Sequence, residues 1–163
     1  MASKLKKLGE GKQIIEYKNN YKIAIVVSEY YLEEINAKLL NACMNILVNN
    51  NIKATNIYIE YVPGAFELTA GAQIMFEKYH PDAVITLGCV IKGDTDHDKY
   101  INHAVSQGIT MLSIQYKKPF IFGLLTPNTM KQALERSGGK HGNKGAEVAE
   151  ACLKMIDLAH KLK

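Results

Sequence analysis

Ala83-Val-Ile-Thr-Leu-Gly-Cys-Val-Ile91 leads into Lys92-Gly-Asp-Thr-Asp-His-Asp-Lys-Tyr100, and this stretch decides the fold that the sequence predicts. Its first part is an apolar run typical of a buried strand, and a helical pattern begins at about Asp98. A buried strand that ends near glycine and opens into a helix leaves backbone N–H groups beside a crevice, where open α/β sheets bind ligands. We therefore expect a site here, with His97 as a proton carrier, since histidine exchanges protons near neutral pH. A solvated loop histidine beside acidic residues is the alternative interpretation.

The same alternation of strand and helix extends on both sides of this stretch. Apolar runs predict strands at 22–27, 57–62, 83–91 and 120–125. Helical spacing predicts helices at about 33–50, from the Pro63 turn to 79, 98–114, 130–135 and 146–162. Four alternations predict one α/β domain over residues 1–163, a three-layer α/β/α arrangement with a four-stranded parallel sheet of the flavodoxin-like type. Residues 1–12 are expected to be flexible, and Gln13–Tyr17 is a candidate extra edge strand.

Composition describes an ordinary globular protein, with 47% apolar and 22% charged residues and a formal net charge of +4. Lysines at the two chain ends carry much of this charge, and no RNA or DNA motif accompanies them, so nucleic acid is not an expected partner. No apolar run reaches the ~18 residues of a membrane span, and the first residues lack the apolar core of a signal peptide. Cys43, Cys89 and Cys152 have no short metal-type spacing, and the first and last are expected to be buried. We therefore expect a cytoplasmic protein without membrane contact.

Metal and nucleotide sites are not predicted. Asp94, Asp96 and Asp98 alternate as in a calcium loop, but the sixth position is Lys99 rather than glycine and the twelfth is Val105 rather than glutamate. No His or Cys set with metal-ligand spacing completes another site. We therefore expect no metal.

The glycine-rich segment 138–145 is not a triphosphate-binding loop. Asn143 precedes Lys144, and Gly145 follows it where a Walker loop needs serine or threonine. What remains is a flexible cationic turn with Arg136, the sole arginine, directly before it. Its guanidinium can make a forked contact with an anion, although an ordinary helix-surface arginine is the alternative.

Three aromatic residues, Tyr30, Phe66 and Phe122, stand at or just beyond predicted strand ends. Because the carboxyl ends of parallel strands share one edge of a sheet, the three rings together can hold a flat ligand. Taken singly, each is more readily explained by core packing.

Three motifs in order carry a resemblance over about residues 22–159. They are Val62-Pro-Gly-Ala-Phe-Glu67, Gly88-Cys-Val-Ile-Lys-Gly-Asp-Thr-Asp-His97, and Arg136 followed by Gly142-Asn-Lys-Gly145. The ordered set resembles 6,7-dimethyl-8-ribityllumazine synthase, a family of riboflavin biosynthesis. Its members condense 5-amino-6-(D-ribitylamino)uracil with 3,4-dihydroxy-2-butanone 4-phosphate, losing phosphate and water, without metal or organic cofactor.

The resemblance implies a role for each matched position. For the pyrimidine substrate it implies that Tyr30 stacks on the ring. Contacts with the ribityl chain are implied for Ala65, Phe66 and Glu67. The backbone of Cys89, Val90 and Ile91 is implied to line the pyrimidine pocket. For the butanone phosphate it implies contacts from Asp94, Thr95 and Arg136, with Lys144 as an auxiliary cation. His97 is implied as the catalytic proton carrier. Phe122 is implied to come from a neighbouring subunit, since sites of the family lie between subunits.

Three positions depart from the family pattern. Tyr30 stands where phenylalanine or tryptophan is usual, and Asp94 where a small residue or glutamate is common. Asp98 replaces an aromatic residue, and it is expected either to favour the protonated form of His97 or to cap the helix. These departures bear on substrate affinity and pH optimum.

The resemblance also implies a homo-oligomer. The family forms pentamers, pairs of pentamers or icosahedral shells of sixty chains, and the short 138–145 link is similar to that of shell-forming members. Riboflavin synthase is a candidate partner. The alternative function is a non-catalytic shell or flavin-binding protein on the same fold. A flavodoxin-like binding domain and a pentameric riboflavin synthase are further rivals.

Overall fold

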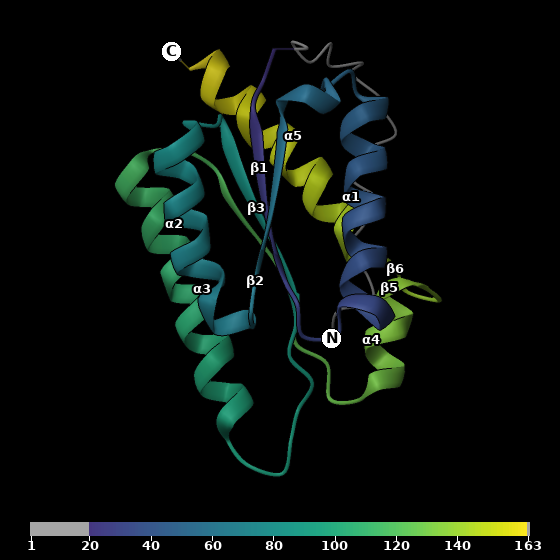
Figure 1. Ribbon diagram of the computed structural model, residues 1–163. Helices are drawn as coiled ribbons and strands as arrows, with labels where there is room; N and C mark the ends of the chain where they lie inside the picture. The colour runs from purple at the N-terminus through teal and green to yellow at the C-terminus, as the bar shows by residue number, and fades with distance from the viewer. Residues whose placement is uncertain (1–19, 163) are drawn as a thin grey trace.

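The computed structural model describes residues 20–162, which form a central sheet covered by helices on both faces (Figure 1). The sheet has four parallel strands in the order β2-β1-β3-β4, with β1 at Ile23–Ser28, β2 at Ile57–Val62, β3 at Ala83–Cys89 and β4 at Phe120–Leu125. The predicted three-layer α/β fold with a four-stranded parallel sheet is confirmed. The flexible residues 1–12 and the candidate strand Gln13–Tyr17 lie outside the described residues.

Residues 20–162 form five α-helices around the sheet. They are α1 (Ala37–Asn49), α2 (Leu68–Tyr79), α3 (His97–Tyr116), α4 (Met130–Arg136) and α5 (Lys144–Lys161). Short helical turns precede α1 (η1, Leu32–Asn36), β2 (η2, Ala54–Asn56) and α2 (η3, Ala65–Glu67). In Figure 1, α2 and α3 lie on one face of the sheet and α1 and α5 on the other. None of the helices in this part of the chain is long and apolar enough to cross a membrane.

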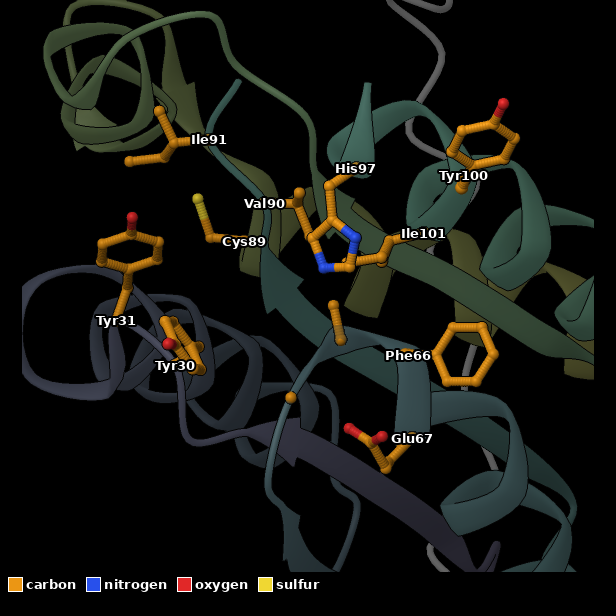
Figure 2. Close-up of a pocket in the computed structure, with 12 residues that line it drawn as sticks. Tyr30, Tyr31, Phe66, Glu67, Cys89, Val90, Ile91, His97, Tyr100 and Ile101 are labelled. Atoms are coloured by element: carbon orange, nitrogen blue, oxygen red, sulfur yellow. The ribbon is translucent and has the colours of Figure 1, made fainter. Parts of the chain in front are cut away.

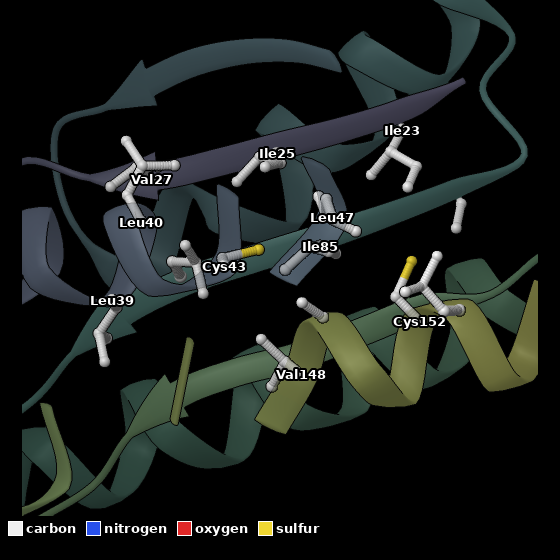
Figure 3. Close-up of a cluster of buried hydrophobic side chains, with 14 of the residues drawn as sticks. Ile23, Ile25, Val27, Leu39, Leu40, Cys43, Leu47, Ile85, Val148 and Cys152 are labelled. Carbon is white, nitrogen blue, oxygen red and sulfur yellow. The ribbon is translucent and has the colours of Figure 1, made fainter. Parts of the chain in front are cut away.

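The central strands are buried on both faces, which explains their continuous apolar runs. Every residue of β1 and of β3 is buried. On one face their side chains pack against α1 and α5, in the cluster that Figure 3 shows around Cys43 and Cys152. On the other face, Ala24, Val26 and Val84 pack against α2 and α3. Burial of both helical cysteines confirms the prediction, and it raises the pKa of Cys43 to about 12.

Two details differ from the predicted elements. The first helix begins with a π-helical turn, and the residue before this turn, Tyr31, adopts a left-handed conformation (φ 58°). Segment 138–145, predicted as a flexible turn, includes most of a short antiparallel hairpin, β5 (Ser137–Gly139) with β6 (Gly142–Asn143), and Gly138 and Gly142 there have positive φ. α5 follows at once, with Gly145 so close to α1 that a Cβ atom would lie 1.9 Å from the Leu39 carbonyl oxygen. Only glycine allows this approach of the two helices.

Candidate active site

A pocket of about 580 Å³ lies at the carboxyl ends of β1, β2 and β3. We call it the aromatic pocket, because four of its lining residues are aromatic (Figure 2). It is lined by Tyr30 and Tyr31 after β1, Gly64, Ala65, Phe66 and Glu67 after β2, Cys89, Val90 and Ile91 at the end of β3, and His97, Tyr100 and Ile101 of α3. Its size and its place at the strand ends suit a small-molecule ligand.

A buried asparagine fixes the backbone that places Tyr30 at this pocket. The Nδ2 group of Asn36 donates hydrogen bonds to the Ser28 carbonyl oxygen (2.8 Å), the Ser28 Oγ (3.1 Å) and the Tyr30 carbonyl oxygen (2.7 Å). Asn36 is fully buried, so these bonds are shielded from water and hold the loop after β1 in one course. Sequence analysis missed this residue, and its only signal was a polar side chain beside Ile35 on the buried side of a predicted helix.

Tyr30 and Phe66, two aromatic residues of the pocket, are exposed, as a stacking role requires. Tyr30 is 69% exposed and Phe66 is 60% exposed, although both belong to well-packed segments. In Figure 2, the two rings lie apart, Tyr30 beside Tyr31 and Phe66 beside Glu67. Core packing, the alternative interpretation, is therefore wrong for these two residues. Exposed aromatic faces bind flat apolar rings with little loss of conformational freedom.

Cys89 and Glu67 contribute different chemistry to the aromatic pocket. Cys89 is 1% exposed, and burial raises the pKa of its thiol to about 12, so the sulfur stays protonated at neutral pH and is no nucleophile. Glu67 is the N-cap residue of α2, and its Oε2 lies over Gly64, where a Cβ atom would come within 3.1 Å of it. The carboxylate is thus held at the pocket wall beside the N-terminal turn of α2, where it can accept hydroxyl hydrogen bonds.

His97 is the first residue of α3 and is exposed to solvent. In Figure 2 its imidazole lies between Val90 and Ile101. Its backbone N–H donates to Thr95 Oγ1 at 3.4 Å. Asp96 occupies the N-cap position, so Asp98 lies inside the first turn and the prediction that it caps the helix is wrong. An exposed imidazole at a pocket mouth can reach a bound ligand and exchange protons with solvent.

Asp94 and Thr95 lie in the exposed loop between β3 and α3. Neither lines the aromatic pocket of the single chain. The loop is anchored at its start, where the Lys92 N–H donates to the Pro127 carbonyl oxygen at 3.0 Å. Their predicted contacts with the butanone phosphate stay predictions.

A second hollow, of about 510 Å³, lies beyond the end of β4, and we call it the charged hollow. It is lined by Phe122, Leu124, Leu125, Thr126, Pro127, Gln132, Glu135, Arg136, His141 and Lys144. It shares no lining residue with the aromatic pocket. The two are nevertheless adjacent in the backbone, because the Val90 N–H donates to the Leu125 carbonyl oxygen at 2.9 Å. The structure therefore brings Phe122, Arg136 and Lys144 together, apart from the other predicted site residues.

Glu147 holds both cations of the charged hollow, and sequence analysis missed it. Arg136 makes a forked pair with it, Nη1 to Oε1 at 2.9 Å and Nη2 to Oε2 at 3.0 Å. Lys144 Nζ lies 3.3 Å from the same Oε2. Burial alone would raise the pKa of Glu147, but the hydrogen bonds and charges of Arg136 and Lys144 together lower it. The Lys144–Glu147 spacing was visible in the sequence, whereas the Arg136 contact depends on the hairpin.

Within residues 20–162, no group of three or more His, Cys, Asp or Glu side chains is placed to hold a metal ion.

Comparison with known proteins shows the family of the chain. A family model described as 6,7-dimethyl-8-ribityllumazine synthase matches residues 20–160. The protein of that name from Parabacteroides distasonis is 48% identical over 137 residues, which cover 84% of this chain and 85% of that protein. The one from Bacteroides fragilis is 47% identical over 141 residues, 86% of this chain and 98% of that protein. The one from Porphyromonas gingivalis is 46% identical over 137 residues, 84% of each chain. The chain belongs to the 6,7-dimethyl-8-ribityllumazine synthase family.

Proposed function

We propose that this chain condenses 5-amino-6-(D-ribitylamino)uracil with 3,4-dihydroxy-2-butanone 4-phosphate to form 6,7-dimethyl-8-ribityllumazine, with release of phosphate. One observation carries the proposal: this chain, a member of the family, has both an exposed aromatic pocket with His97 and a hollow with Arg136 and Lys144. The first suits a flat pyrimidine with a polyol chain, and the second suits a phosphate ester.

The pyrimidine substrate binds in the aromatic pocket in this proposal. Tyr30 stacks on its ring, and the backbone N–H groups of Ala65 and Phe66 with the Glu67 carboxylate bind the ribityl hydroxyls. The backbone that runs through Cys89, Val90 and Ile91 lies against the ring edge, where N–H and C=O groups can pair with pyrimidine atoms. Phe66, with 60% of its surface exposed, is available for a ring contact as well.

The butanone phosphate binds at the charged hollow. Arg136 already binds the Glu147 carboxylate with both Nη atoms, so its guanidinium is held in a geometry that suits two oxygens of a phosphate. Lys144 adds a second positive charge, and Asp94 and Thr95 contact the phosphate from the loop before α3. Phosphate binding in this proposal loosens Glu147 from Arg136, because one guanidinium fork cannot hold two anions in the same geometry.

The chemistry needs proton transfers at each stage. The pyrimidine amine attacks the ketone carbon, and water leaves as a Schiff base forms. Elimination of phosphate leaves a new carbonyl, and the second amine attacks that carbonyl and closes the ring with loss of a second water. His97 at the pocket mouth accepts and returns these protons, which is worth about 100-fold or more in rate. Holding two substrates in register supplies a further share of the acceleration.

The complete site forms between two subunits. The aromatic pocket and the charged hollow share no lining residue within one chain, which supports a site in which Phe122, Arg136 and Lys144 come from the neighbour. Ile74 on α2 and Met111 and Ile114 on α3 are between 63% and 66% exposed, as expected for a face that another copy covers. We propose a pentamer that assembles further into a sixty-chain shell. Native mass spectrometry checks this, since the masses must be multiples of 18.2 kDa.

A cytoplasmic location is part of the proposal, because Cys43, Cys89 and Cys152 are free thiols, which suit a reducing compartment. Association with riboflavin synthase stays a prediction, and co-purification of the two proteins tests it.

The direct test mixes the purified chain with both substrates, without added metal, and follows lumazine absorbance together with phosphate release. Equal rates of lumazine and phosphate formation are expected. A folded, assembled protein that releases no phosphate and forms no lumazine would instead favour the non-catalytic shell or flavin-binding alternative.

A further inference from the structure

His141 lies in the charged hollow beside the two cations assigned to phosphate. It occupies the turn between β5 and β6, and its carbonyl oxygen accepts a hydrogen bond from Arg136 Nη1. Its Nε2 lies 3.7 Å from Glu135 Oε2, and both residues line the hollow together with Lys144. The side chain is still 56% exposed, so an incoming anion can reach it.

Without His141 the charges of the hollow cancel. Arg136 and Lys144 are positive, whereas Glu135, which lines the hollow, and Glu147, which pairs with both cations, are negative. A phosphate ester carries about −1.5 to −2 charges at neutral pH. A hollow without net charge attracts such a ligand only through local geometry, so one additional cation changes its potential substantially. Histidine is the side chain that can add a positive charge between pH 5 and 8.

We propose that His141 is a phosphate-binding residue whose protonated imidazole adds a third positive charge to the charged hollow, so that oxyanion affinity rises as the pH falls. The inference rests on the proposed function for the identity of the phosphate compound. The anion site itself follows from the contacts of the hollow.

Other charged groups around the turn keep their charges over this pH range. Lys140 is the neighbour of His141 in the turn, and Lys38 lies on α1, where its carbonyl oxygen accepts a hydrogen bond from Asn143 Nδ2 at 3.2 Å. Lysine and glutamate ordinarily stay ionised between pH 5 and 8. In the proposed assembly His97 of a neighbouring subunit is a second histidine of the site, so it needs its own control.

Inorganic sulfate is the probe of choice, because its charge of about −2 does not change over the pH range in which phosphate esters titrate. Its dissociation constant is measured by calorimetry on the assembled native protein between pH 5.5 and 8.5 at constant ionic strength. We expect sulfate to bind about threefold more tightly at the acid end, the size of a partly exposed charge contact. An affinity that is flat across this range overturns the inference.

Variants separate His141 from the other groups. His141→Asn is expected to bind sulfate weakly at every pH, and His141→Lys to bind it tightly at every pH, because the first removes the charge and the second fixes it. Lys140→Gln and His97→Gln serve as controls and are expected to keep the native pH dependence. The Arg136 bond to residue 141 uses a backbone oxygen, so it survives all of these substitutions.

Two further results decide the matter. Persistence of the native pH dependence in His141→Asn, or its persistence in His141→Lys should the first variant fail to fold, overturns the inference. Sulfate binding is measured without turnover, so its outcome is independent of the proposed function. Native protein that binds sulfate in this way but forms no lumazine supports the inference and contradicts the proposed function.

Discussion

The aromatic pocket and the charged hollow differ in how their side chains are held. In the aromatic pocket, Tyr30 and Phe66 expose their rings, while the backbone beneath them is fixed by Asn36 and by buried strand ends. In the charged hollow, Arg136 and Lys144 are both tied to Glu147. One region is thus open before a ligand arrives, and the other already holds an internal anion.

The difference indicates how each region binds. An exposed ring on a rigid backbone offers surface at little cost in conformational entropy. A cation paired with an internal carboxylate is kept in its working geometry, but the ligand must compete with that carboxylate. We therefore expect substitutions in the aromatic pocket to change turnover and pyrimidine binding, and substitutions in the charged hollow to change mainly the affinity for the phosphate substrate.

The largest effect is expected for His97→Gln, which removes the proton carrier from the mouth of the aromatic pocket. The kcat should fall by about 100-fold or more, as for the loss of a general acid–base group, with little change in either KM. Steady-state lumazine formation measures this. His103→Gln, on the exposed side of the same helix, is the matched control and should retain native kcat. Equal losses in the two variants would point to helix damage rather than proton transfer.

Arg136→Ala should act on the other region. Loss of a forked, charge-assisted contact of about 2 kcal/mol raises the KM for butanone phosphate by about 30-fold and leaves the KM for the pyrimidine nearly unchanged. The KM of Arg136→Lys for butanone phosphate should lie between those of the native chain and Arg136→Ala, since lysine keeps the charge but loses the forked contact. Lys131→Ala, an exposed residue of the same helix, is the control. A rise in the pyrimidine KM instead would contradict the separation of the two regions.

A mixed assembly sharpens the comparison further. If the two regions meet only across a subunit boundary, co-expressed His97→Gln and Arg136→Ala chains form some sites in which both residues are native. With random assembly of equal amounts, about a quarter of the sites are restored. Activity well above that of either variant alone is expected. Activity no higher than the average of the two single variants would place the whole site within one chain.

The smallest effect is expected for Glu147→Gln, measured as the change in thermal stability with pH. Arg136 and Lys144 lower the pKa of Glu147 in the folded chain, despite the opposing effect of burial. A depressed folded pKa stabilises the fold above the unfolded value near 4.5, and this contribution disappears as the pH falls through the folded pKa. The variant should be less stable than the native chain at pH 7, by under about 1 kcal/mol because the pair is partly exposed. The two melting temperatures should converge as the pH falls below 4.5 and through the lowered folded pKa, and a constant difference would contradict the linkage.

Much of the fold could be predicted from the sequence, because its central strands are buried on both faces. Burial on both faces requires continuous apolar runs, such as 83–89, and prolines mark the element boundaries. Strand 120–125 was predicted at its observed bounds. The hairpin at 137–143 was missed, since its strands have only two or three residues and depend on glycines with positive φ. Glu147 was missed for a related reason, because its contact with Arg136 requires the chain to turn back through that hairpin.

The sequence by itself determined the layered α/β fold, the family and the identity of the side chains that can carry the chemistry, because periodicity and motif order are local properties. Only the tertiary structure decided how those side chains are divided between two regions and which of them are already paired. Residues far apart in the sequence, such as Phe66 and Cys89 or Arg136 and Glu147, meet because parallel strands end at one edge and α5 packs closely on α1 through Gly145. Such contacts depend on the path of the whole chain, which no local pattern specifies.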